Sequence, residues 1–219
     1  TGKTVISAFD YKRFKNSNTS AKLLFIAHRK EILLQARATF QGVLRDNNFG
    51  ELWVDGIVPS SNEYIFASIQ TLQNNLESLN LTSDYYDFII IDEVHHIAAN
   101  SYRPVLEKFD PKILLGLTAT PERMDNENIL NDFCDVVAAE IRLPEALNRK
   151  LLCPFQYFGI SDNVDLKNIK WQNGKYSPSE LTKAYNSNIR VGDVILKCEE
   201  YLTDIKNVIA LCFCVTQEH

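Results

Sequence analysis

Four short runs of consecutive apolar residues constrain the fold of this chain more than any other feature of its sequence. They are LLFIA (23–27), YIFAS (64–68), FIIID (88–92) and ILLGL (113–117), and ELWV (51–54) is a further candidate strand. Their apolar residues are continuous and do not alternate with polar ones, so each strand must be covered on both faces. The sequence therefore predicts an α/β fold, with a parallel sheet and helices on both of its faces.

Longer segments with helical periodicity separate these runs. The clearest has apolar residues at Ile32, Leu33, Ala36, Phe40 and Leu44, which is the spacing of an amphipathic helix. Helices are predicted directly after Thr4 in VISAF (5–9), from about Arg29 to Asn47, from Ile69 to Leu79 and around Tyr102 to Phe109.

The character of the sequence changes near Leu143. Prolines and a polar stretch over residues 161–177 indicate a connecting segment, which we place at 143–187. A helix is predicted over Asn188–Leu202, and the apolar run VIALCFCV (208–215) is predicted to be a strand. The expected domains are thus residues 1–142, the connecting segment 143–187, and the start of a second α/β domain at 188–219.

Composition excludes some classes of protein. No run of about 18 apolar residues is present, so no membrane span is expected, and the beginning TGKTVISAFD does not resemble a signal peptide. The five cysteines have no paired C-x-x-C spacing. Their odd number, with no secretory signal, favours reduced thiols in a cytoplasmic protein. Cys212 and Cys214 are expected to be small buried residues of the predicted strand.

Charge is unevenly distributed along the chain. The net charge is −5, but residues 1–50 carry nine basic and three acidic side chains, whereas residues 51–145 carry five and 17. This distribution is compatible with a local phosphate-binding face in the N-terminal segment. It is equally compatible with ordinary solvated helices.

Adjacent carboxylates, Asp92 and Glu93, end the strand FIIID. In an open parallel sheet the carboxyl ends of the strands form the edge where ligands bind. One carboxylate can hold the hydration shell of Mg²⁺, and the other can accept a proton from an attacking water. The alternative is a solvated acidic turn at a strand end.

Two further short motifs are compatible with a nucleotide site. The four residues TGKT (1–4) match the last part of the phosphate-binding loop G-x-x-x-x-G-K-[ST], with Gly2, Lys3 and Thr4 at its defined positions, although so short a match can also arise by chance. Thr118 and Thr120 follow the strand ILLGL, where their hydroxyls can hydrogen-bond neighbouring side chains or simply cap a turn.

A zinc site at His95 and His96 is the less favoured alternative for this region. Adjacent histidines do not easily face one ion, and no pair of cysteines has ligand spacing.

In this order, TGKT (1–4), IIIDEVHH (89–96) and LTATP (117–121) resemble the motifs of the superfamily 2 DEAD/DEAH-box helicases and translocases. AHRKEIL (27–33) resembles motif Ia of that family, and ASIQTL (67–72) resembles a later motif that contacts nucleic acid. The resemblance implies a RecA-like P-loop NTPase domain followed by the start of a second RecA-like domain.

The DEVHH form is of the DExH type and is similar to the branch shared with the motor subunits of type I and type III restriction enzymes. RLPEALNRKLLCPFQYFGISD (142–162) and ALCFCVTQEH (210–219) resemble bacterial DEAD/DEAH-box proteins. Those proteins often also carry a phospholipase-D-like nuclease domain, which these residues do not contain. The chain therefore looks like a fragment of a larger motor.

The resemblance implies a role for each matching residue. Gly2 and Lys3 would bind the ATP phosphates, Thr4 and Asp92 would hold Mg²⁺, and Glu93 would polarise the hydrolytic water. His95, Thr118 and Thr120 would couple the nucleotide state to nucleic-acid contacts, and His96 would support or pack. The residues expected to contact the nucleic-acid backbone are Arg29, Gln70 and Thr71.

The implied function is ATP-dependent movement along nucleic acid or separation of its strands, with DNA favoured over RNA. One alternative is a restriction-type translocase that moves on duplex DNA without separating it. Another is a nucleic-acid-binding module that does not hydrolyse ATP. Because the family's phosphate loop begins before Thr1 and its second domain supplies arginines to the nucleotide, residues 1–219 alone are expected to be inactive.

Overall fold

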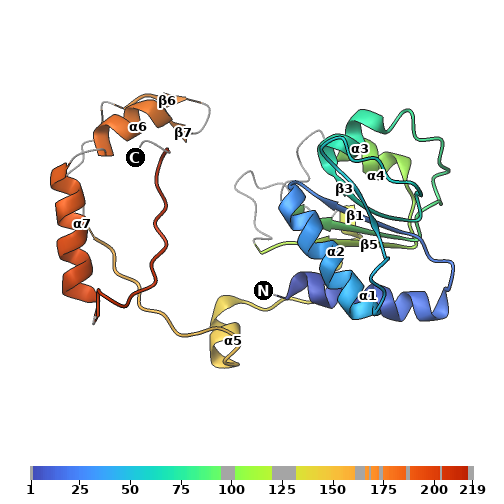
Figure 1. The fold of residues 1–219 in the computed structure, drawn as a ribbon, viewed down its shortest axis with the longest axis horizontal. Helices are drawn as coiled ribbons and strands as arrows, with labels where there is room; N and C mark the ends of the chain where they lie inside the picture. Colours follow the sequence, from blue (N-terminus) through green and yellow to red (C-terminus); the bar gives the residue numbers. More distant parts are fainter. Residues whose placement is uncertain are drawn as a thin grey trace. The chain divides into compact units, whose positions relative to one another are not determined.

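The computed structural model describes residues 2–94, 102–119, 132–160, 166–167, 169–172, 175–185, 188–202 and 204–216. The chain divides into two compact units, Thr1–Arg142 and Leu143–His219. Each unit has its own secondary structure (Figure 1).

The first unit is built on a five-stranded parallel sheet with the strand order β2-β3-β1-β4-β5. In its centre, Ile26 pairs with Ala67 of β3 on one side and with Ile91 of β4 on the other. The apolar runs predicted to be strands are strands in the structure. Their bounds are β1 Leu23–Ala27, β2 Glu51–Trp53, β3 Tyr64–Ser68, β4 Phe88–Asp92 and β5 Ile113–Leu117.

Each face of the sheet has its own hydrophobic core, as the continuous apolar runs require. Successive residues of β1 alternate between the cores, because Leu24 and Ile26 belong to one and Leu23 and Phe25 to the other. This arrangement leaves no solvated face on the central strands, and the predicted α/β fold is confirmed.

Four helices cover these two faces (Figure 1). The helices α1 (Lys3–Ser17) and α2 (Lys30–Leu44) pack on one face through side chains that include Tyr11 and Phe40. The helices α3 (Ile69–Asn75) and α4 (Arg103–Lys108) pack on the other face, where Leu72 contributes to the core.

The predicted helices are present, but two of them end earlier than expected. The helix α2 stops where Arg45 adopts a left-handed conformation with φ of 58°. The helix α3 begins where the Ser68 hydroxyl accepts a hydrogen bond from the Thr71 amide, and it ends at Asn75, short of the predicted Leu79. Hydrophobic periodicity continues into turns that pack on the core, so it overestimates helix length.

Gly116 in β5 is a point of close packing. A Cβ atom there would lie 2.9 Å from the ring of Phe133 and 3.2 Å from Val94. Phe133 itself packs against the core that contains Val94. Beside it, Asp132 forms an ion pair at 2.9 Å with Arg103, the first residue of α4. The segment around Phe133 is thereby tied to β5 and to α4.

The second unit contains five described elements. They are α5 (Leu143–Asn148), β6 (Trp171–Gln172), β7 (Lys175–Tyr176), α6 (Pro178–Tyr185) and α7 (Asn188–Tyr201). The two strands form an antiparallel pair, and the predicted helix from Asn188 is α7. The assignment of 143–187 as a connecting segment and of 188–219 as the start of a second RecA-like domain stays a prediction.

The strand predicted over Val208–Val215 is wrong. The structure assigns no strand there, and Ile209, Leu211 and Phe213 are exposed. Cys212 and Cys214, expected to be buried, are exposed as well. A strand needs a neighbouring backbone to complete its hydrogen bonds, and β6 and β7, the strands described in this unit, pair with each other.

Among the described residues, the structure contains no helix whose length and apolar character would let it cross a membrane.

The close packing at Gly116 generates a test of stability. We expect Gly116→Ala to lower the free energy of unfolding by about 1–3 kcal/mol, the usual cost of overpacking. Urea denaturation followed by circular dichroism measures this change.

Gly42→Ala is the matched control, because Gly42 lies within α2 and a Cβ there meets nothing within 4 Å. Alanine is the better helix former, so this variant should gain up to about 1 kcal/mol. Equal unfolding midpoints for Gly116→Ala and wild type would contradict the close packing of Phe133.

Candidate nucleotide site and nucleic-acid groove

The motif Gly2-Lys3-Thr4 forms the beginning of α1. Gly2 precedes the helix with a left-handed φ of 85°, a conformation that glycine adopts without strain. The first helical hydrogen bond runs from the Ile6 amide to the Gly2 carbonyl. The amides before Ile6 have no partner within the helix, and such groups favour an anionic ligand.

Asp92 and Glu93 lie at the carboxyl end of β4, as predicted. Asp92 is buried, with 7% of its surface exposed, and one of its carboxylate oxygens accepts a hydrogen bond of 3.0 Å from the Glu93 amide. Glu93 has a left-handed φ of 52°, which is uncommon for a residue with a side chain. The chain therefore turns sharply at Glu93, directly after the strand.

Lys3 and Glu93 connect the two motifs. The Lys3 ammonium group lies 3.6 Å from a Glu93 carboxylate oxygen, and both side chains are about one-third exposed or less. The structure thus brings the start of α1 and the end of β4 together at one edge of the sheet. Sequence spacing predicted this meeting only through the rule that ligands bind at the carboxyl ends of strands.

The surroundings of Asp92 disfavour the ionised form of its carboxyl group. Burial raises the pKa of Asp92, and the nearby charge of Glu93 raises it further, whereas the Glu93 amide and the charge of Lys3 lower it. A buried carboxylate at this edge of the sheet suits a divalent cation, which would restore the solvation lost on burial.

Mg²⁺ is the cation that these residues fit. Mg²⁺ usually binds through one or two carboxylates together with substrate phosphates and waters. The partly buried Thr4 follows Lys3 at the start of α1 and, with Asp92, is a candidate ligand. Across the described ranges, no group of three or more His, Cys, Asp or Glu side chains could hold a metal ion by itself.

Tyr102 is a residue of this site that sequence reasoning did not find. Its side chain is buried, and its hydroxyl has no hydrogen-bond partner among the described residues. Burial raises the pKa of Tyr102 to about 12, and the charges of Asp92 and Glu93 contribute to this increase. No local motif marks Tyr102, because its proximity to these carboxylates arises from the packing of α4 on β4.

The predicted coupling residues are only partly described. Thr118 is half-buried and follows Leu117, which pairs with Asp92 across β4 and β5. Thr118 therefore lies beside the turn that carries Glu93. His95, His96 and Thr120 lie outside the described residues, so their predicted roles stay predictions.

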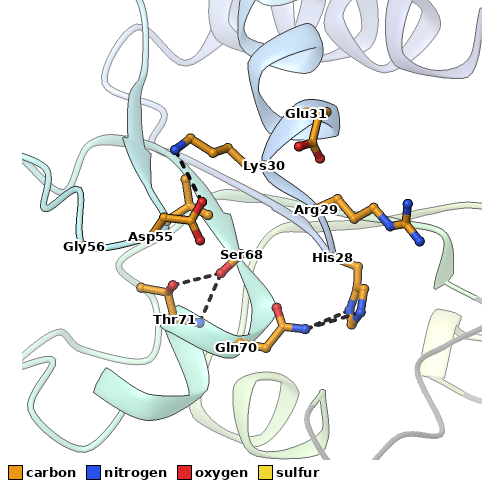
Figure 2. Close-up of a pocket in the computed structure, with 10 residues that line it drawn as sticks. His28, Arg29, Lys30, Glu31, Asp55, Gly56, Ser68, Gln70 and Thr71 are labelled. Carbon is orange, nitrogen blue, oxygen red and sulfur yellow. Dashed lines mark hydrogen bonds and ion pairs between the residues drawn. The ribbon is translucent and has the colours of Figure 1, made fainter. Parts of the chain in front are cut away.

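A groove of about 460 Å³ lies at the carboxyl ends of β1 and β3 (Figure 2). The three residues predicted to contact nucleic acid, Arg29, Gln70 and Thr71, all line it. They meet because Ala27 of β1 pairs with Ser68 of β3, so the segments that follow these strands are neighbours. The groove also contains His28, Lys30, Glu31, Val54, Asp55, Gly56 and Ser68.

Hydrogen bonds hold the polar side chains of this groove in place. The Gln70 side-chain nitrogen lies 2.9 Å from Nδ1 of His28, and the Ser68 hydroxyl lies 2.8 Å from the Thr71 hydroxyl. On the other side of the groove, the Lys30 ammonium group lies 3.3 Å from an Asp55 carboxylate oxygen (Figure 2). Of these residues, His28, Lys30, Asp55 and Ser68 were not predicted as site residues.

Comparison with known proteins places this chain in a family. The family model for "Type III restriction enzyme, res subunit" matches residues 1–123. The "Putative ATP-dependent helicase IRC3" of Saccharomyces cerevisiae is 31% identical over 208 residues, which cover 90% of this chain and 30% of that protein. The chain spans about a third of the length of the first curated relatives that it matches.

Solved structures share the fold. The helicase domain of Hef from Pyrococcus furiosus superposes with a TM-score of 0.50 at 22% identity, covering 61% of this chain and 31% of that one. The Type ISP restriction-modification enzyme LlaGI, solved with a DNA substrate mimic, gives a TM-score of 0.50 at 18% identity, covering 69% and 15%. The chain belongs to the type III restriction enzyme res subunit family, and its first unit has the RecA-like α/β fold of solved helicase domains.

Proposed function

We propose that this chain is the nucleotide-hydrolysing part of an ATP-dependent motor that moves along nucleic acid. The observation that carries the proposal is the meeting of Lys3 with Glu93 beside the buried Asp92. A phosphate-binding lysine, a metal-binding carboxylate and a general base are the groups that phosphoryl transfer to water requires. Family membership and the name of the yeast relative support the same reading.

In this mechanism, each residue acts on a different part of the reaction. Lys3 exchanges its contact with Glu93 for the outer phosphates of ATP, next to the amides at the start of α1. Asp92 and Thr4 would hold Mg²⁺, which would neutralise charge on the phosphates. The Glu93 carboxylate accepts a proton from the water that attacks the γ-phosphoryl group.

The groove lined by Arg29, Gln70 and Thr71 is the proposed contact with the nucleic-acid backbone. A guanidinium, an amide and a hydroxyl hydrogen-bond phosphate oxygens and sugars without reading the sequence of bases. We infer that DNA is the substrate, because the family is named for restriction enzymes and LlaGI was solved with a DNA substrate mimic.

Two kinds of movement fit these residues, namely strand separation and translocation on intact duplex. The family name favours translocation, whereas the names of IRC3 and of the Hef domain favour a helicase. Displacement of one strand from a duplex reports strand separation. Displacement of a third strand from a triplex, with the duplex left intact, reports translocation.

We expect Glu93→Gln in the full-length protein to reduce ATP hydrolysis by about 10²–10⁴-fold while ATP still binds. The amide keeps the shape of the side chain but cannot accept a proton. A phosphate-release assay and binding of a fluorescent ATP analogue measure the two properties.

Glu107→Gln is the matched control, because Glu107 is an exposed carboxylate of α4. It should hydrolyse ATP at the wild-type rate. If Glu93→Gln hydrolyses ATP within about threefold of wild type, Glu93 is not the base, and a binding module without hydrolysis becomes the better proposal.

Asp92→Asn should raise the free energy of unfolding at neutral pH in the absence of Mg²⁺ and nucleotide, while abolishing hydrolysis. The raised pKa of Asp92 means that its ionised form is disfavoured in the folded state. Below the unfolded-state pKa both states are protonated, so the gain should vanish there and grow as pH rises through the folded-state pKa.

Urea denaturation of wild type and Asp92→Asn at a series of pH values measures this gain. A variant that is less stable than wild type at neutral pH, or one that keeps Mg²⁺-dependent hydrolysis, would rule out this role for Asp92.

We further propose that Thr118, Thr120 and His95 couple hydrolysis to nucleic acid. The pairing of Leu117 with Asp92 supports this role, because it brings Thr118 beside the Glu93 turn.

Replacing Thr118 and Thr120 together by alanine should leave ATP binding intact and reduce the stimulation of hydrolysis by DNA. The coupling would be refuted if the variant kept both the wild-type ratio of DNA-stimulated to basal ATP hydrolysis and the wild-type movement on DNA.

A further inference from the structure

Lys30 and Asp55 form a pair of opposite charges inside the groove that is proposed to bind nucleic acid. Their charged atoms are 3.3 Å apart, and the side chains are 38% and 63% exposed, respectively. Figure 2 shows Lys30 extending toward Asp55, whereas Arg29 extends in a different direction. The ammonium group of Lys30 is therefore already paired with a carboxylate in this groove.

A tight turn holds the Asp55 side of this pair in place. Asp55 and Gly56 both have left-handed φ values, 51° and 80°, and the Ile57 amide donates a hydrogen bond of 2.9 Å to the Val54 carbonyl. Two such residues inside a two-residue turn match the rigid type I′ geometry of hairpins. The backbone of Asp55 is thus fixed, whereas the long side chain of Lys30 can reorient.

The surroundings of the pair suit a phosphodiester. The Thr71 hydroxyl and the Gln70 amide line the same groove as Lys30, and both residue types bind phosphate oxygens. An exposed ion pair such as Lys30–Asp55 contributes little to stability. The lysine can therefore exchange its carboxylate for a phosphate at little cost to the fold.

From this geometry we propose that Lys30 is a phosphate-binding residue of the groove and that Asp55 competes with the nucleic-acid backbone for it. The Asp55 carboxylate is thus a counter-anion within the protein, which weakens the binding of the nucleic-acid backbone to Lys30 and makes its release easier. This inference rests on the proposed function, because it assumes that the groove takes nucleic acid.

Fluorescence anisotropy of the full-length protein with labelled single-stranded and duplex DNA tests the inference across a series of salt concentrations. Asp55→Asn should bind about two- to fivefold more tightly, the range expected when an exposed ion pair no longer competes. Lys30→Gln should bind more weakly, and the slope of log K against log[salt] should become shallower by about 0.7–0.9.

The double variant Lys30→Gln/Asp55→Asn separates competition from simple repulsion. If Asp55 acts through Lys30, the gain from Asp55→Asn disappears in the Lys30→Gln background. A gain of the same size in that background would overturn the inference, because Asp55 would then only repel phosphates. Asp84→Asn is the control for lost charge, since Asp84 is exposed before the amino end of β4, at the opposite edge of the sheet.

The outcome for the wild-type protein distinguishes the inference from the function on which it rests. If the wild-type protein binds neither single-stranded nor duplex DNA, the proposed nucleic-acid groove is refuted, and the inference is refuted with it. Wild-type protein that binds DNA with the same affinity as Asp55→Asn refutes only the competition between Asp55 and phosphate.

Discussion

The parallel pairing of β1 with β3 and β4, and of β4 with β5, is the constraint on which the other features of the first unit depend. Parallel strands end at the same edge of a sheet, so their following residues become neighbours however distant they are in sequence. The Lys3–Glu93 contact and the groove of Arg29 and Gln70 are both at this edge. Continuous apolar strands make this sheet stable only when helices cover both of its faces.

The residues at this edge give up stability for function. Asp92 is buried without a direct ion pair among the described residues, and Glu93 adopts an uncommon backbone conformation. Each is unfavourable by itself, and the packed strands beneath them hold both in place. Gly116, around which Phe133 and Val94 pack closely, pairs with Ile91, the residue directly before Asp92.

Much of the fold and part of the site could be predicted because their signals are local. A continuous apolar run identifies a buried strand, and Asp92-Glu93 after such a run identifies a charged sheet edge. The prediction for Val208–Val215 failed because the same local signal says nothing about whether a partner strand is present. Tyr102 and the Lys30–Asp55 pair were missed for a related reason, since each depends on a contact between elements that are separate in sequence.

By itself, the sequence determined the strands and most of the extent of the helices of the first unit, and it placed the carboxylates Asp92 and Glu93 at the carboxyl end of β4. Only the tertiary structure decided the strand order and the burial of Asp92. It also decided which lysine faces Glu93 and which lysine faces Asp55. The physical reason is that periodicity reports what a residue must bury, whereas lateral strand order and side-chain pairing depend on the free energy of contacts made across the whole sheet.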